Sequence, residues 1–104
     1  MRMATGFIEV FGLAAAFVAV DAGCKAADVT VETLDKNKPG NADALPVPLI
    51  VLIKFRGTVD NVKAAVEAAA AAVEGVTGVV SQHIIANTED STEKMLKLNA
   101  FDKN

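Results

Sequence analysis

The sequence contains no tryptophan or tyrosine, one cysteine, one histidine and three prolines. A single cysteine, Cys24, excludes an intrachain disulfide and fits a reducing cytoplasm. The formal net charge is −3 and the basic residues are scattered, which argues against a nucleic-acid partner. Glu9, Gly12 and Asp21 interrupt the apolar beginning, and no apolar run approaches the roughly 18–20 residues of a membrane span. We therefore expect neither a membrane anchor nor a secretion signal.

Small apolar side chains make up much of what is present. The chain is 52% hydrophobic, which suffices for a core in a domain of this size. Much of that fraction is alanine and valine, which permit close contact between helices and sheet but bury little area per residue. We therefore expect additional burial through self-association.

The order of apolar patterns predicts an α/β fold of a single domain spanning 1–104, with a core over 6–98. Four stretches have the composition of strands and three have that of helices. They are expected as strand 6–12, helix 13–28, strand 28–34, strand 49–57, helix 58–75, strand 78–85 and a short terminal helix 88–98. This βαββαβ order predicts a ferredoxin-like sandwich: an antiparallel four-stranded sheet with two helices on one face.

Each long helix has an apolar stripe that we expect to face the core. In the first helix the stripe consists of Leu13, Phe17, Val20, Cys24 and Ala27. In the second it consists of Val62, Val66, Ala69 and Val73. In the first strand, Phe7, Glu9 and Phe11 share one face while Ile8 and Val10 share the other.

No group of residues predicts catalysis, a cofactor or a metal site. His83 has no cysteine or carboxylate at a metal-ligand spacing, so we expect a partly buried structural histidine. Cys24 is expected to be a small core residue. Glu9 and Glu32 could share a sheet face, but their spacing does not establish a pair. The segment RGTVDNVK lacks the glycines and lysine spacing of a phosphate-binding loop.

Three segments, in the right order, resemble the single-domain shell proteins of bacterial microcompartments, the BMC-domain family. GFIEVFGLAAAFVAVDAGCKAADVTV (6–31) is similar to the family's opening, RGTVDNVKAAVEAA (56–69) to its second helix, and GVVSQHII (78–85) to its last strand. The residues in register in the opening are Gly6, Ile8, Glu9, Gly12, Leu13, Ala15, Asp21, Ala22, Lys25, Ala26, Ala27 and Val29.

The resemblance implies a homohexamer with a central pore for small metabolites, tiled into the facets of a shell in the bacterial cytoplasm. The implied partners are other shell proteins of the same compartment and the enzymes it encapsulates. The Ile-Glu pair at 8–9 favours a catabolic compartment, a metabolosome, over a carboxysome.

The long connection between the second and third strands would then surround the pore, with an insertion at about 36–48. The residues expected to line the pore are Asn41, Ala42, Asp43, Ala44, Leu45, Pro46, Val47 and Pro48. Pro46 and Pro48 have no N–H, so this rim would bind anions more weakly than a glycine-rich rim. The alternative is a surface loop that contacts nothing.

The resemblance also places Lys25, Asp28 and Asn87 at the hexamer edge, where neighbouring hexamers meet. For Lys25, the alternative is a helix-surface ion pair with Asp21. Two departures from the family pattern occur here: Asp28 stands where asparagine is frequent, and Ala86-Asn87-Thr88 replaces a Pro-Arg-Pro loop. The lost arginine leaves open whether the tiles form flat sheets.

Two other functions fit the same fold class, because one architecture hosts many functions. The first is a small regulatory domain whose long loop closes over a bound ligand. The second is an enzyme that uses His83 with a carboxylate.

Overall fold

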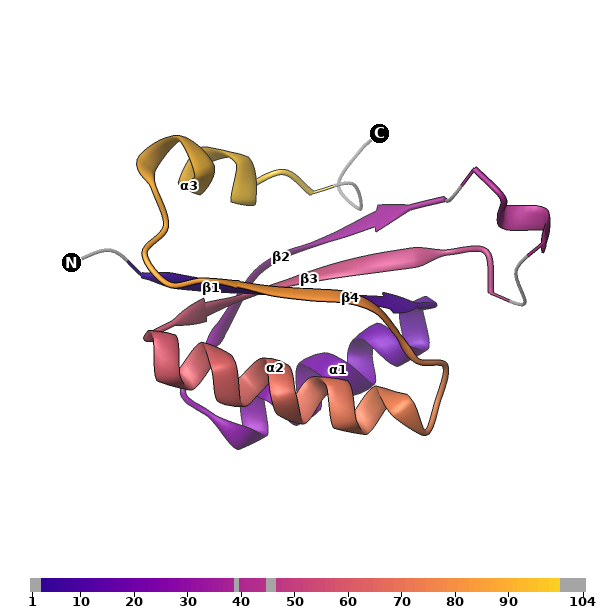
Figure 1. Cartoon of the computed structure of the whole chain (residues 1–104), viewed down its shortest axis with the longest axis horizontal. Coiled ribbons are helices and arrows are strands. Elements are labelled where there is room, and N and C mark those ends of the chain that lie inside the picture. Colours follow the sequence, from indigo (N-terminus) through magenta and orange to yellow (C-terminus); the bar gives the residue numbers. More distant parts are fainter. Residues whose placement is uncertain (1–2, 39, 45–46, 100–104) are drawn as a thin grey trace.

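The computed structural model describes residues 3–38, 40–44 and 47–99, and it has the predicted βαββαβ order (Figure 1). The elements are β1 (Ala4–Phe11), α1 (Leu13–Ala26), β2 (Thr30–Asn37), the short 3-10 helix η1 (Ala42–Ala44), β3 (Ile50–Gly57), α2 (Val59–Glu74), β4 (Val79–Ile85) and α3 (Asp90–Leu96). The fold class expected from the sequence is confirmed.

The four strands form one sheet in the order β2-β3-β1-β4, and every neighbouring pair is antiparallel. The central strand β1 pairs with β3 on one side, Ile8 opposite Ile53, and with β4 on the other, Ile8 opposite Gln82. β2 is longer at its end than the predicted strand 28–34, because its pairing with β3 continues to Asn37 opposite Ile50. The strand connection is shortened accordingly.

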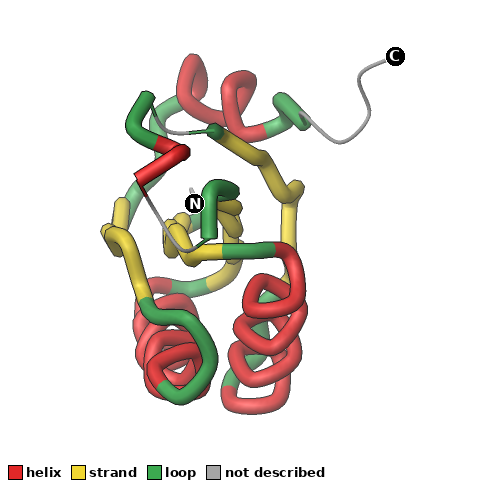
Figure 2. Tube along the Cα trace, turned by 90° about the vertical axis from the view of Figure 1, so that its right-hand side faces the viewer, coloured by secondary structure: helices red, strands yellow, loops and turns green. Residues whose placement is uncertain are grey.

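Helices cover both faces of the sheet. Figures 1 and 2 show α1 and α2 side by side on one face and α3 on the other. The predicted alternation in β1 is confirmed, since Ile8 and Val10 are fully buried while Phe7 and Glu9 are half-buried. β3 is buried along most of its length because it lies between the two helical layers.

The stripe predicted for α1 was wrong at Leu13, Phe17 and Cys24, which are exposed. Its other two residues, Val20 and Ala27, are half-buried and pack against the core. The fully buried residues of α1 are instead Ala15, Ala16, Ala19 and Gly23. Small residues face inward because α1 lies very close to α2 and the sheet: a methyl group at Gly23 would lie 2.5 Å from Cζ of Phe55 and 3.1 Å from the backbone oxygen of Ala65. Leu13, Phe17 and Val18 are left on the outer surface.

The stripe predicted for α2 is confirmed, because Val62, Val66, Ala69 and Val73 are all buried. Thr58 is the N-cap of α2, and its hydroxyl accepts a hydrogen bond from the amide of Asn61. Two helices are shorter than predicted. α1 ends at Ala26 because Ala27 has an extended backbone, and the terminal helix α3 covers 90–96 rather than 88–98. Among the described helices, none is long and apolar enough to cross a membrane.

Replacing Gly23 with alanine should destabilise the protein. The added methyl meets the buried Phe55 ring, and overpacking of this kind costs about 1–3 kcal/mol. The helix-propensity gain of about 1 kcal/mol for alanine over glycine offsets only part of that cost. Urea unfolding would measure the change. Gly75→Ala is the matched control, since a methyl group there has no atom within 4 Å. Equal stability of the two variants would contradict the close packing.

Candidate functional site

The predicted pore segment forms one end of the molecule. Because β2 and β3 pair as far as Asn37 and Ile50, the described residues of the connection, 38, 40–44 and 47–49, project beyond the sheet (Figure 1). Within the projection, the amide of Ala44 donates to the carbonyl of Asn41 at 2.9 Å, which closes the short η1 turn. Asn41, Asp43, Ala44 and Pro48 are exposed, and Val47 is half-buried. The predicted pore residues Leu45 and Pro46 lie outside the described residues.

The base of this projection is fixed to the start of α1. The amide of Gly12 donates to the carbonyl of Leu49 at 2.8 Å. Gly12 has a φ of 91°, a conformation that favours glycine, and a methyl group there would lie 3.3 Å from Cγ1 of Val47. The projection therefore leaves the sandwich at a defined place beside the first turn of α1.

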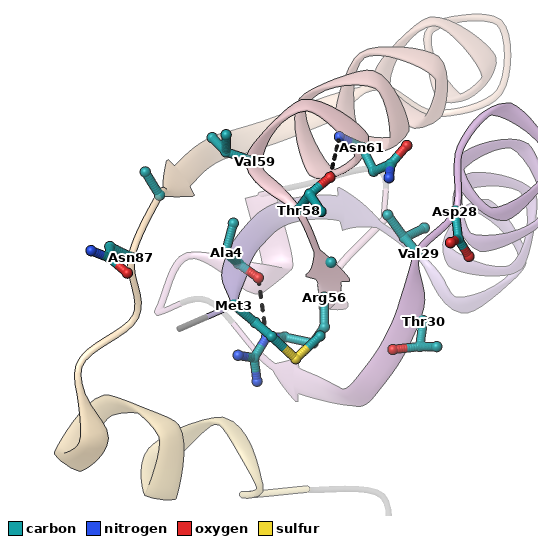
Figure 3. A pocket seen from close by; sticks show the side chains of 12 residues that line it. Met3, Ala4, Asp28, Val29, Thr30, Arg56, Thr58, Val59, Asn61 and Asn87 are labelled. Carbon is teal, nitrogen blue, oxygen red and sulfur yellow. Dashed lines mark hydrogen bonds between the residues drawn. The ribbon is translucent and has the colours of Figure 1, made fainter. Parts of the chain in front are cut away.

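Two of the three predicted edge residues border one groove at the opposite end. Asp28 precedes β2 and Asn87 follows β4, and both line a groove of about 540 Å³ that also contains Thr58 and Asn61 (Figure 3). Figure 3 shows Asp28 and Asn87 on opposite sides of it. The third, Lys25, lies in the last turn of α1, at the same end of the molecule in Figure 1. The chain thus gathers the predicted edge residues far from the predicted pore segment.

Lys25 forms the ion pair that was the alternative to a tiling contact. Its Nζ lies 2.8 Å from Oδ2 of Asp21, one turn earlier in α1. The Lys25 side chain is 75% exposed, so the pair contributes little to stability. An exposed ammonium that is already positioned by a neighbouring carboxylate is still free to contact another molecule.

Sequence reasoning missed a buried cationic cluster on the α3 face of the sheet. Lys54 and Arg56 of β3 are only 3% and 4% exposed. Nζ of Lys54 donates to the Thr33 hydroxyl at 3.0 Å and to the carbonyls of Leu96 and Leu98 at 3.2 and 2.9 Å. All three donors of the ammonium thus have acceptors. The sequence signal for this cluster is two cations in a strand that is otherwise apolar.

Arg56 makes the second half of the cluster. Its guanidinium donates to the carbonyl of Ala4 at 3.2 Å, to Glu32 at 3.2 Å and to both carboxylate oxygens of Glu93. The hydrogen bond from Arg56 holds the pKa of Glu93 below its ordinary value. Burial lowers the pKa of Lys54, against the opposing effect of nearby carboxylates. These bonds fasten α3 to the sheet, so the cluster is structural.

The other candidate residues are dispersed over the molecule. His83 is exposed on β4, so the expectation of a partly buried histidine was wrong. Cys24 is exposed rather than part of the core, which also corrects its prediction. Glu9 accepts a hydrogen bond from Ser81, whereas Glu32 pairs with Arg56. Among the described residues, no group of three His, Cys, Asp or Glu side chains could hold a metal ion.

Comparison with known proteins identifies the family. Residues 4–88 match the BMC domain, and the chain therefore belongs to the BMC-domain family. It is 37% identical to the bacterial microcompartment shell protein PduA of Citrobacter freundii, with 89% of this chain and 90% of that protein covered. It is 36% identical to the carboxysome shell protein CcmK1 of Thermosynechococcus vestitus, with 94% of this chain and 80% of that protein covered.

The fold also matches a solved structure. A crystal structure of a microcompartment protein from Desulfitobacterium hafniense superposes with a TM-score of 0.71 at 23% identity. The match covers 93% of this chain but 48% of that one, so this chain spans about half of its length. At this identity the similarity supports the sandwich fold alone.

Replacing Glu93 with glutamine should loosen α3. A carboxyl group with a lowered pKa contributes stability above its ordinary pKa and loses that contribution as the pH falls through the lowered value. Hydrogen-exchange protection of residues 90–98 should therefore decrease in acid in the native protein, and already at neutral pH in Glu93→Gln. Glu74→Gln, an exposed carboxylate on α2, is the control. Unchanged protection in Glu93→Gln would show that Arg56 does not hold α3.

Proposed function

We propose that this protein is a structural shell component whose hexamers tile edge to edge, with a central pore built from residues 38–49. Family membership supports the structural role, since the relatives that match over most of their length are named as shell proteins and not as enzymes. The observation that carries the hexamer arrangement is the separation of the predicted pore and edge residues at opposite ends of the molecule (Figure 1).

In a ring, an elongated subunit can lie with one end at the axis and the other at the perimeter. The molecule measures 43 × 30 × 20 Å, and its long axis runs from the projecting loop to the groove that contains Asp28 and Asn87. Contacts between the flanks of such units are head-to-tail, and they close into a ring when the rotation permits. The groove end then meets neighbouring rings.

The loop chemistry favours a pore for small polar metabolites. Asn41 and Asp43 offer polar side chains that are exposed on the projecting segment. Pro48 lacks a backbone donor, so the rim has fewer N–H groups to bind anions than a glycine-rich rim. Anchoring of Leu49 to Gly12 would keep the rim in place around the axis.

The proposed partners and cellular location follow from the proposed shell role. Assembly with other shell proteins of the same compartment follows from the shell relatives. The enclosed partners would be enzymes, and the location would be the bacterial cytoplasm. No observation favours the regulatory ligand-binding domain, and the dispersed His83 and carboxylates give no support to an enzyme.

Replacing Lys25 with alanine should abolish extended sheets and leave the hexamer intact. Lys25 lies at the end of the molecule that would form the perimeter, away from the ring axis. Negative-stain microscopy would show the sheets, and native mass spectrometry would give the number of subunits. Lys94→Ala, which removes an exposed lysine of α3, should retain both. Loss of the hexamer in Lys25→Ala would contradict the edge assignment.

Replacing residues 41–46 with a short Gly-Ser link should also leave the hexamer intact. The sheet pairing ends at Asn37 and Ile50, so the change leaves every strand and long helix complete. Sedimentation velocity would compare the variant with the native protein at equal concentration. Dissociation into smaller species would mean that the projecting loop holds the ring together instead of surrounding its pore.

A further inference from the structure

The sheet face opposite α1 and α2 is only partly covered by α3. Arg56 of β3 donates to Glu93 of α3. Lys54, two residues earlier in β3, donates to the carbonyls of Leu96 and Leu98. Both cations are almost completely buried beneath these partners. The chain at and after α3 therefore follows β3 from Arg56 to Lys54, in the direction of the projecting loop (Figure 1).

The next side chains along this face remain accessible. Side chains alternate along a strand, so Leu52 shares the face of Lys54. Glu9 of β1 and Asp35 of β2 lie opposite Leu52 in the two neighbouring strands. These three residues are half-buried, whereas Ile53, which points to the opposite face, is fully buried. An apolar side chain is thus left in contact with water in the middle of the sheet.

A groove of about 270 Å³ lies over this part of the face. Its lining residues are Glu9, Asp35, Lys36, Asn37, Ile50 and Leu52. Two of these are apolar and come from β3, two are acids and one is a lysine, so the negative charges outnumber the positive one. The groove therefore suits an apolar side chain that is accompanied by a cation.

The sequence continues with Ala-Phe-Asp-Lys-Asn, residues 100–104, which lie outside the described residues. The hydrogen bond from Lys54 fixes Leu98 over β3, and Leu52 is about 7 Å further along the strand. Three extended residues span about 10 Å, so Phe101 is within reach of Leu52. The length of this segment and the place where the described chain ends both make it a suitable occupant of the groove.

We propose that residues 100–104 dock into this groove of their own chain, with Phe101 packed on Leu52. The docking extends along β3 the cover that α3 begins. An aromatic ring buries a large apolar area and therefore makes an effective anchor. The contact lies within one chain and goes beyond the proposed shell role, since it holds whether or not rings form. Another molecule can bind in the groove only by displacing the segment.

The charges of the segment complement those of the groove. In an extended segment, Lys103 points to the same side as Phe101, and Asp102 to the other side. Asp35 lies 3.9 Å from Lys54, and Glu9 accepts a hydrogen bond from Ser81. Each carboxylate has further acceptor positions, because an ionised carboxylate offers about four. The ammonium of Lys103 can therefore join either carboxylate while Phe101 packs between them.

Tryptophan fluorescence tests the docking directly, because the native chain contains no tryptophan. Phe101→Trp keeps an aromatic ring at the docking position. Its emission should lie at shorter wavelength, and be quenched less by acrylamide, than that of Lys97→Trp, a control at an exposed position. Equal emission and quenching in the two variants would show that position 101 stays in water and would overturn the proposal.

A second substitution in the Phe101→Trp protein tests the groove. Leu52→Gln removes the apolar contact and should shift the emission to the wavelength of the exposed control. Met95→Gln, which changes an exposed apolar residue of α3, should leave the emission unchanged. If circular dichroism shows that Leu52→Gln unfolds the protein, Lys103→Glu replaces it, since this change lies outside the elements of the fold and places a carboxylate against Glu9 and Asp35. Unchanged emission in the folded variant would overturn the proposal.

Mixing separates docking within one chain from docking onto a second copy. A chain with both Phe101→Trp and Leu52→Gln has a fluorescent segment and a damaged groove. Unfolding it in urea with an excess of native protein, and refolding the two together, offers the segment the intact grooves of other copies. The emission should remain at long wavelength. A return to short wavelength would show that the segment docks onto another chain, and would overturn the proposal.

Discussion

The close packing of α1 against α2 and β3 depends on alanine and glycine at the fully buried positions of α1. Gly23 contacts the Phe55 ring and the backbone near Ala65 so closely that even a methyl group would collide. This closeness orients the helix: Ala15, Ala16, Ala19 and Gly23 face inward, whereas Leu13, Phe17 and Val18 are exposed. The inner packing of the chain thereby leaves Leu13 and Phe17 on its outer surface.

A second constraint acts on the opposite face of the sheet. Lys54 and Arg56 are buried there and gain acceptors from the residues at and after the end of α3 and from carboxylates of β2 and α3. Removing a partner from a buried charge is strongly unfavourable, so these residues and α3 act as a unit. α3 consequently covers the part of this face around Lys54 and Arg56, while Glu9 and Leu52 on the same face stay half-buried.

The sequence predicted the features that depend on local pattern. Alternation around Ile8 and Val10 and the spacing of Val62 and Val66 identified buried faces, and the element order identified the sheet. Periodicity failed for α1 because the helix has two apolar faces, and spacing alone does not tell which one meets the sheet. The larger residues of the stripe around Phe17 appeared the stronger core candidates, but close packing selected the alanines.

In the candidate site, too, local sequence pattern predicts less than the contacts between residues that are far apart in the chain. Asp28 and Asn87 are 59 positions apart, and only the motif resemblance placed both at one edge; the structure brings them to one groove through the sheet topology. The partners of Lys54 and Arg56 lay outside any local pattern, since Glu93 and Leu96 follow β3 at long range and reach it only when α3 docks. The residues around His83 in the sequence likewise do not indicate that His83 is exposed on an edge strand of the sheet.

We propose that each subunit is oriented with its projecting loop at the axis of the ring and with the groove of Asp28 and Asn87 at the perimeter. Electron cryo-microscopy of the purified protein would test this most directly by placing the chain in the assembled particle. The account predicts six subunits with residues 38–49 surrounding the centre. A particle with this loop on its outer rim, or one without a six-subunit ring, would contradict it.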